Sequence, residues 1–270
     1  MKATVSDVVD MMEVIAPTRL AEEWDNVGLQ VGAGDWPVGT VWVSLDPRPD
    51  VVDQAAEAGA DLLITHHPLL FKPLRSVDPS TPVGAILVRA LASKTAIYAA
   101  HTNLDSAVDG LNDLLAGAIG LTDLRPLAAV ASGDDAGEGL GRIGRLPAPL
   151  ELETFARQVE TALGVKSAAK LSGRADLKVE TAAVCSGSGS SLMRQFLNSD
   201  AQVYVTGDLR YHDALDAQDA DRGLVDIGHF ASEAIVVDLL VRRLSEMARS
   251  KGMNLTVEPC RIQRDPFRTL

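Results

Sequence analysis

Two adjacent histidines, His66 and His67, stand at the end of a short apolar run and are followed at once by Pro68. Imidazole nitrogen is the commonest side-chain ligand of metal ions in proteins. The chain contains five histidines, and the other three each follow another short apolar run directly or within a few residues; they are His101, His212 and His229. Histidines buried only for packing would not be expected to recur at strand ends. The pattern predicts a metal site at the carboxyl edge of a sheet.

Carboxylates accompany two of these histidines at a spacing of four residues. His229 and Glu233 fall at the start of a predicted helix, where side chains four residues apart project to the same side. His101 and Asp105 have the same spacing across a loop, where the helical argument is weaker. Both pairs therefore add carboxylates to the candidate metal ligands.

Three or four histidines with two carboxylates exceed what one tetrahedral ion requires. Such a set suits two ions that a carboxylate bridges, about 3.5–4 Å apart. Neighbouring side chains on a strand point to opposite faces, but beyond the strand end His66 and His67 can diverge toward the two ions. Imidazole and carboxylate without thiolate fit Zn, Mn, Fe, Co or Ni, and they do not fit a structural cysteine-rich zinc site. The expected cofactor is two divalent metal ions per subunit.

The sequence also contains three further candidate side chains, Asp25, Asn26 and Asp208. Asp208 follows the predicted strand 202–206, and His212 comes shortly after it. For His212 three interpretations stay open. It could support a metal ligand without binding the ion itself, face the substrate, or cap a helix. Asp25 and Asn26 either make a turn, since both side chains bond their own backbone well, or support the metal site.

The segment Ser186-Gly187-Ser188-Gly189-Ser190 has the composition of a turn that binds phosphate at a helix start. A tight turn from strand to helix would require the same small residues, so the composition alone does not decide between them. The sequence contains no G-x-S-x-G motif, no P-loop and no strand-linked G-x-G-x-x-G motif.

Strands and helices alternate along the chain, which predicts an α/β fold with largely parallel pairing. The expected strands are 41–45, 61–65, 96–100, 181–184, 202–206, 224–227 and a last strand over 254–259 and 261–263. The expected helices are 6–15 with Ser6 as N-cap, 50–58, 83–91, 111–118, 152–163, 191–197 and 232–248.

The order of elements repeats. The strand–turn–helix–strand of 41–67 recurs at 181–208, and the strand followed by histidine at 96–101 recurs at 224–229, which predicts an internal duplication of two similar α/β units. The acidic, glycine-rich link 134–139 is the candidate boundary. The first unit is expected to be 1–130, with a possible return of the C-terminal strand in 254–270, carrying His66, His67, His101 and Asp105. The second is expected to be 138–253, carrying Asp208, His212, His229 and Glu233.

The composition sets limits on partners and compartment. The chain has 270 residues, 46% hydrophobic and 23% charged, and a net charge of −12, which disfavours nucleic-acid partners and anionic membranes.

Cys185 and Cys260 show no metal-ligand spacing, and two buried thiols in a reducing cytosol are favoured over a disulfide. The first residues show no signal or transit pattern, and no apolar run reaches the roughly 18 residues that span a bilayer. We expect a cytoplasmic protein.

Five motifs, taken together, resemble the Nif-three-like family, whose members carry the name type 2 homologues of GTP cyclohydrolase I. The motifs lie in order over essentially the whole chain: Trp24-Asp25-Asn26-Val27-Gly28-Leu29, Thr65-His66-His67-Pro68, His101-Thr102-Asn103-Leu104-Asp105, Thr206-Gly207-Asp208 with Tyr211-His212, and Gly228-His229 with Glu233. The lack of a long central insertion resembles the short form of the family. Arg48 departs from the family pattern, in which threonine is more usual at that position.

The resemblance implies two intertwined three-layer α/β/α domains with parallel or mixed sheets, and a dinuclear metal centre. It also implies a toroidal homohexamer, a trimer of dimers, with the metal sites facing the interior. His67 and Asp105 would hold one ion, and His66 and His229 the other. Glu233 would bridge both ions. His101 would lie beside them as a supporting or proton-transfer group.

The expected function is a metal-dependent hydrolase, in which metal-bound water attacks an electrophilic carbon or phosphorus atom of a small molecule. His101 or His212 would move protons. By the family name the substrate would be a nucleotide, GTP, opened at its purine C8. The alternative is a non-enzymatic ring that binds, stores or delivers metal, or an adaptor that uses metal for assembly. Nucleic acid threading through a ring is disfavoured by the charge.

Overall fold

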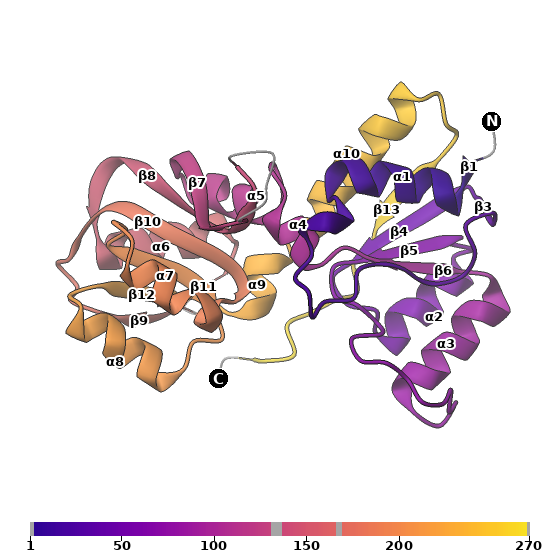
Figure 1. Cartoon of the computed structure of the whole chain (residues 1–270), viewed down its shortest axis with the longest axis horizontal. Coiled ribbons are helices and arrows are strands. Elements are labelled where there is room, and N and C mark those ends of the chain that lie inside the picture. Colours follow the sequence, from indigo (N-terminus) through magenta and orange to yellow (C-terminus); the bar gives the residue numbers. More distant parts are fainter. Residues whose placement is uncertain (1–2, 131–136, 166–168, 269–270) are drawn as a thin grey trace. The chain divides into compact units, whose positions relative to one another are not determined.

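In a computed structural model, which describes residues 3–130, 137–165 and 169–268, the chain folds as two compact units (Figure 1). The first unit contains the residues up to Leu104 and the segment Val236–Arg264. The second unit contains Asp105–Ile235 and the residues from Asp265 onward. The short helix α4 (Thr102–Ser106) includes the point of division.

The first unit is built on a five-stranded sheet. Its strands are β2 (Gly28–Val31), β4 (Thr40–Ser44), β5 (Leu62–Thr65), β6 (Ala96–Ala99) and β13 (Thr256–Pro259), in the order β13-β4-β5-β6-β2. All neighbours are parallel except β2, which pairs antiparallel with β6. A separate antiparallel pair consists of β1 (Ala3–Thr4) and β3 (Pro37–Val38).

Helices cover both faces of this sheet. They are α1 (Val5–Ile15), α2 (Pro49–Glu57), α3 (Pro82–Ser93) and α10 (Val236–Ser250), with the 3-10 turn η1 (Thr18–Leu20). Figure 1 shows α1 and α10 on one face and α2 and α3 on the other. Leu63 and Ile97, whose side chains face α2 and α3, are fully buried in the core between them. Thr4 caps α1 by a capping box with Asp7, so the expected cap at Ser6 was wrong.

The second unit is built on a six-stranded sheet. Its strands are β7 (Thr122–Ala129), β8 (Gly139–Glu151), β9 (Lys170–Ser172), β10 (Lys178–Ser188), β11 (Val203–Gly207) and β12 (Gly223–Asp226), in the order β7-β8-β10-β11-β12-β9. β10, β11 and β12 are consecutive parallel neighbours, and the other pairs are antiparallel.

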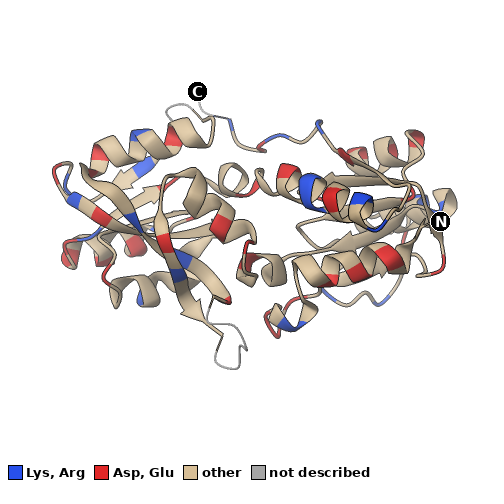
Figure 2. Cartoon of the chain, turned by 90° about the horizontal axis from the view of Figure 1, so that it is seen from above, with Lys and Arg blue, Asp and Glu red and all other residues tan. Residues whose placement is uncertain are grey.

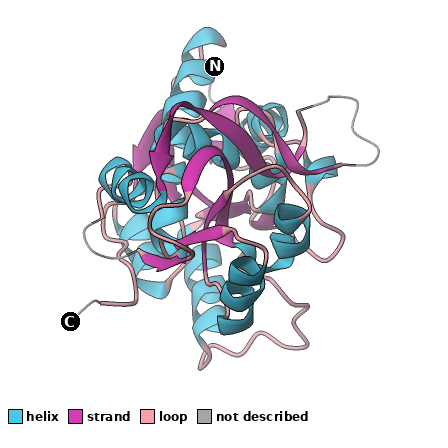
Figure 3. Ribbon diagram, turned by 90° about the vertical axis from the view of Figure 1, so that its left-hand side faces the viewer, coloured by secondary structure: helices cyan, strands magenta, loops and turns pink. Residues whose placement is uncertain are grey.

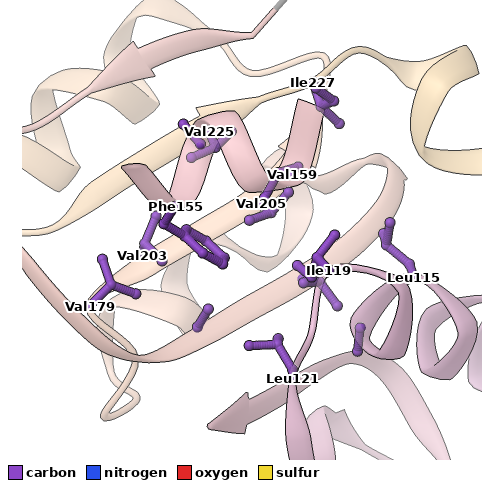
Figure 4. Close-up of a cluster of buried hydrophobic side chains, with 14 of the residues drawn as sticks. Leu115, Ile119, Leu121, Phe155, Val159, Val179, Val203, Val205, Val225 and Ile227 are labelled. Atoms are coloured by element: carbon purple, nitrogen blue, oxygen red, sulfur yellow. The ribbon is translucent and has the colours of Figure 1, made fainter. Parts of the chain in front are cut away.

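Side chains alternate between two cores in the second unit because neighbouring residues on a strand face opposite ways. The helices are α5 (Leu111–Ala118), α6 (Leu152–Ala162), α7 (Met193–Leu197), α8 (Tyr211–Asp219) and α9 (His229–Glu233), with the 3-10 turn η2 (Gly189–Leu192). Val203 and Val205 pack in one core with α5 and α6 (Figure 4), whereas Tyr204 packs in the other core with α7 and α8. Figure 3 shows the helices (cyan) and strands (magenta) of the chain from another side.

The α/β class with parallel and mixed sheets is confirmed. The parallel trio β4-β5-β6 has the same consecutive order as β10-β11-β12, while the internal duplication itself stays a prediction. The expected single helix 232–248 is two helices, α9 and α10, and the expected last strand is shorter, since only β13 forms.

The division of the chain differs from the expected one. The link 134–139, whose residues 134–136 lie outside the described residues, connects β7 and β8, which are neighbours in one sheet. Leu115 of α5 and Ile119, which directly follows this helix, pack in the core of the second unit, and Asp105 belongs to that unit and not to the first. α10 belongs to the first unit, where Leu240 and Leu244 are buried.

The described residues contain no helix that is long and apolar enough to cross a membrane. Figure 2 shows the positions of acidic residues (red) on helices and loops of both units, with basic residues (blue) interspersed. Cys185 and Cys260 are free, buried thiols, as expected. Burial, and then the nearby Asp105 carboxylate, raises the pKa of Cys185 to about 12.

Arg142 is the largest fully buried side chain, and it ties β8 to the segment that leads into α5. Its guanidinium donates to both carboxylate oxygens of Asp113 and to the backbone carbonyls of Ala107, Gly139 and Gly141. Removing one partner of a buried ion pair leaves the other charge uncompensated.

We predict that Arg142→Met lowers the free energy of unfolding of the second unit by about 3 kcal/mol or more, because Asp113 and three carbonyls lose their donor. Arg145→Met is the matched control, since Arg145 lies three residues along the same strand and is exposed. Urea unfolding followed by circular dichroism measures both. Equal effects of the two substitutions would contradict the importance of the buried network.

Candidate metal-binding site

Three histidines of the first unit lie together where two neighbouring strands end. β5 and β6 are parallel with Thr65 opposite Ala99, so the residues that follow them meet at one edge of the sheet. His66, His67 and His101 each offer a ring nitrogen there, and these atoms lie within 4.8 Å of one another. This spacing allows the three rings to bind one metal ion or two neighbouring ions.

Each of these rings has an oxygen acceptor at Nδ1. The acceptor of His66 is the Ala100 carbonyl at 2.8 Å, that of His67 is Oδ1 of Asp46 at 2.7 Å, and that of His101 is Oδ1 of Asp25 at 2.9 Å. A carbonyl or carboxylate oxygen only accepts, so the hydrogen lies on Nδ1. In the neutral ring, Nε2 then carries the lone pair that binds a metal ion.

Asp25 is the most firmly held of these acceptors. Its side chain is fully buried, and one carboxylate oxygen accepts from the backbone N–H of Thr102 at 3.1 Å and from its hydroxyl at 2.5 Å. Burial acts to raise the pKa of Asp25, but the hydrogen bonds from His101 and Thr102 outweigh it and lower the pKa to about 2. Of the two interpretations of Asp25, the geometry favours support of the histidine over a simple turn.

Asn26 has a different role. Its side-chain amide donates to the carbonyl of Leu70 at 2.5 Å, and Leu70 N–H donates to Oε1 of Gln30 at 3.1 Å. These bonds fasten the loop that follows His67 to the segment that carries Asp25. Asn26 therefore anchors the loop beside the histidines.

In the second unit, one histidine and one glutamate lie together on α9. His229 Nε2 lies 3.0 Å from Oε2 of Glu233, and His229 Nδ1 lies 2.7 Å from Oδ2 of Asp208. β11 and β12 are parallel neighbours, so Asp208 and His229, which follow them, meet at one edge. Glu233 is almost fully buried. Here again an aspartate engages Nδ1 and leaves Nε2 directed at a candidate ligand.

Asp105, also in the second unit, is held by polar partners on two sides. Its Oδ1 accepts from the Ser186 hydroxyl at 3.0 Å, and its backbone carbonyl accepts from the Asn112 side chain at 3.0 Å. The carboxylate is buried and fixed in orientation.

His212 lies apart from these groups. It is exposed on α8, and its ring edge contacts Tyr211 at 5.4 Å between centroids. Arg210 occupies the N-cap position of α8, so the capping interpretation of His212 was wrong. In the described chain, His212 joins no group of three candidate ligands.

Sequence reasoning missed Asp46 and Asn112, and it noted Ser186 only as part of a possible phosphate-binding or tight turn. Asp46 carries a signal that was available, since it follows β4 as Asp208 follows β11. Asn112 and Ser186 carry none, because an asparagine early in a helix and a serine at a strand end are common without a function.

The donor chemistry fits divalent metal ions. Imidazole and carboxylate are borderline-to-hard ligands, and the buried thiols of Cys185 and Cys260 add no soft sulfur ligand to either set. The fold and these groups define an α/β protein with candidate metal ligands at the carboxyl edges of its parallel strands.

The chain belongs to the Duf34/NIF3 (NGG1p interacting factor 3) family, whose model matches residues 3–266. A Streptomyces coelicolor protein named "GTP cyclohydrolase 1 type 2 homolog" is 34% identical to it, over 97% of this chain and 93% of that protein. A Clostridium acetobutylicum protein of the same name is 30% identical over 99% of both. The crystal structure of a Bacillus cereus protein related to NIF3 is similar with a TM-score of 0.93, 28% identity and 100% coverage of both chains. The family resemblance is confirmed.

We predict that Asp25→Asn lowers the free energy of unfolding of the first unit by about 2 kcal/mol at pH 7 and by progressively less in acid. The folded pKa of Asp25, about 2, lies below the unfolded value, so its stabilisation is complete above about pH 5 and is lost as the pH falls from about 4 to 2. Urea unfolding at pH 7, 4 and 3 measures the difference from wild type.

The exposed Asp35, in the same unit, supplies the control Asp35→Asn. Its difference from wild type is expected to stay small and constant over this range. A difference for Asp25→Asn that does not shrink toward pH 3 would show that the ionised carboxylate is not the stabilising group.

Proposed function

We propose that this protein is a metal-dependent hydrolase that binds two divalent ions per chain. The observation that carries the proposal is a hydrogen bond at Nδ1 in four of the five histidines, which leaves Nε2 of each ring for metal binding or, in His101, for proton transfer. The four are His66, His67, His101 and His229. Packing alone does not require four histidines to be held by the same nitrogen, whereas a metal site in which a bond at one ring nitrogen orients the other toward the ions accounts for it.

The ligand assignment follows the family resemblance. His67 and Asp105 would hold one ion, His66 and His229 the other, and Glu233 would bridge the two. The support is chemical, since imidazoles and buried carboxylates are the ligands that a bridged pair of divalent ions requires. The toroidal homohexamer that the same resemblance implies stays a prediction.

Divalent ions held in this way lower the pKa of water and polarise carbonyl or phosphoryl oxygens. The protein's own groups would orient the substrate and move protons. Asp25 fixes the hydrogen on Nδ1 of His101, so Nε2 is able to accept a proton and return it during hydrolysis. Asp46 and Asp208 would restrain the two ligand rings that they contact.

The proposed substrate is a nucleotide, with hydrolysis of GTP at the purine C8 as the specific reaction. The support is the name that the relatives carry, "GTP cyclohydrolase 1 type 2 homolog". His212 is exposed beside the exposed Tyr211, so it would serve as a substrate-facing group rather than as a metal ligand.

Elemental analysis of protein purified without added metal is expected to find about two divalent ions per chain, as a bridged pair requires. Glu233→Ala should reduce this content strongly because it removes the bridging carboxylate. Glu246→Ala, at an exposed glutamate, is the matched control and should keep both ions. Wild-type protein that contains no metal and cannot be reloaded would overturn the proposal.

Metal-loaded protein is expected to hydrolyse GTP with release of formate, and a chelator should abolish the reaction until metal is returned. Asp25→Asn should lower kcat by about 100-fold, the usual contribution of a proton-transfer group, while the metal content stays near two. Formate release and metal content are measured on the same samples. Turnover that is unchanged after metal removal would contradict hydrolysis by this site, and bound metal without turnover would favour the metal-delivery or adaptor alternative.

A further inference from the structure

The C-terminal end of β10 departs from regular strand pairing next to the candidate carboxylates. From Val184 to Ser188 the strand advances by four residues, while its partner β11 advances by two, from Val205 to Gly207. The surplus residues form a bulge, and a bulge redirects the side chains within it. Ser186 and Gly187 lie in this bulge.

Ser186 uses its side chain and its backbone to hold the segment that carries Asp105. The hydroxyl donates to Oδ1 of Asp105 at 3.0 Å, and the backbone N–H donates to Oδ1 of Asn112 at 2.8 Å. Asn112 in turn donates to the backbone carbonyl of Asp105 at 3.0 Å. All three residues are buried, so these bonds form a closed network without competition from water.

Gly187 serves α9 in a different way. Its N–H donates to the hydroxyl of Ser232 at 2.9 Å, and that hydroxyl donates to the carbonyl of His229 at 2.8 Å. A Cβ atom at Gly187 would lie 2.2 Å from Oε1 of Glu233 and 3.2 Å from Nε2 of His229. The residue also has φ of +63°, which favours glycine. The space that a side chain would fill is occupied by the Glu233 carboxylate.

We propose that the bulge at Ser186-Gly187 positions two metal-binding carboxylates. The Ser186 hydroxyl orients the carboxylate of Asp105. Gly187, which has no side chain, leaves the space that the carboxylate of Glu233 occupies. This inference rests on the proposed metal site. It also accounts for the serine and the glycine at positions 186 and 187 without a bound phosphate, since only the short turn η2 and the short helix α7 follow β10. One strand end thus sets the places of carboxylates that come from two different segments.

The first test compares Ser186→Ala with Ser190→Ala in the full-length protein. The Ser190 hydroxyl donates to the buried carboxylate of Asp213 at 2.6 Å. Ser190→Ala therefore removes the same kind of hydrogen bond as Ser186→Ala, but at a carboxylate that is not a proposed metal ligand. The longer bond of Ser190, to the Asp208 carbonyl at 3.3 Å, does not involve the Asp208 carboxylate. Zn²⁺ affinity is measured by competition with a chelator, and thermal stability is measured on the metal-free proteins.

Ser186→Ala is expected to weaken the affinity for at least one Zn²⁺ by about 10- to 100-fold, the usual effect of removing a group that holds a ligand. Ser190→Ala should leave Zn²⁺ affinity unchanged, with a similar loss of metal-free stability. Ser186→Thr keeps the hydroxyl and should recover most of the affinity. Wild-type affinity in Ser186→Ala would overturn the role of Ser186, and wild type that binds no Zn²⁺ would overturn the proposed metal site as well.

The second test compares Gly187→Ala with Gly164→Ala. Gly164 has φ of +68°, and no atom lies within 4 Å of the place that an added Cβ would take, so its substitution carries the backbone strain alone. Gly187→Ala adds the collision with Glu233 and should reduce bound Zn²⁺ from two ions to one or none, whereas Gly164→Ala should keep both. Two bound ions in folded Gly187→Ala would overturn the role assigned to Gly187.

Discussion

A hydrogen bond from Nδ1 to a fixed oxygen sets the orientation of each candidate histidine ligand, and the rest of the site depends on this constraint. An imidazole can rotate about two bonds and can carry its hydrogen on either nitrogen. An acceptor on one side removes both freedoms. The acceptors of His67, His101 and His229 are carboxylates, which also stabilise positive charge on the ring. The fold therefore has to position the oxygen atoms that accept from Nδ1 as well as the imidazole rings.

Both units meet this requirement in the same manner. Asp46 follows β4 and holds His67, which follows the parallel neighbour β5. Asp208 follows β11 and holds His229, which follows the parallel neighbour β12. Parallel strands bring their carboxyl ends to one edge, so two residues far apart in sequence meet there without a special loop. The repeated arrangement agrees with the repeated order of elements along the chain.

The sequence was sufficient for the α/β class, for the strands that pair in parallel, and for four histidines and one glutamate among the candidate ligands that group in the structure, whereas the antiparallel strands β7, β8 and β9 were missed. These signals are local: an apolar run that ends in histidine, and a carboxylate four residues later. The residues that support Asp105 were not predictable in this way. Ser186 and Asp105 are 81 residues apart, and the bond between them depends on a strand bulge that no local pattern marks. The division of the chain was also missed, because the packing of α5 against the second sheet depends on strands that come later.

The discontinuity of the first unit bears on the order in which the chain can fold during synthesis. Its sheet is complete only when β13 pairs with β4, and these strands are more than 200 residues apart. The second unit is almost continuous in sequence, so nearly all of it is synthesised before α10 and β13 of the first unit. Once the second unit has folded, it shortens the effective loop that the first unit must close, which lowers the entropy cost of closure. The middle of this chain thus acts as a folding scaffold for its two ends.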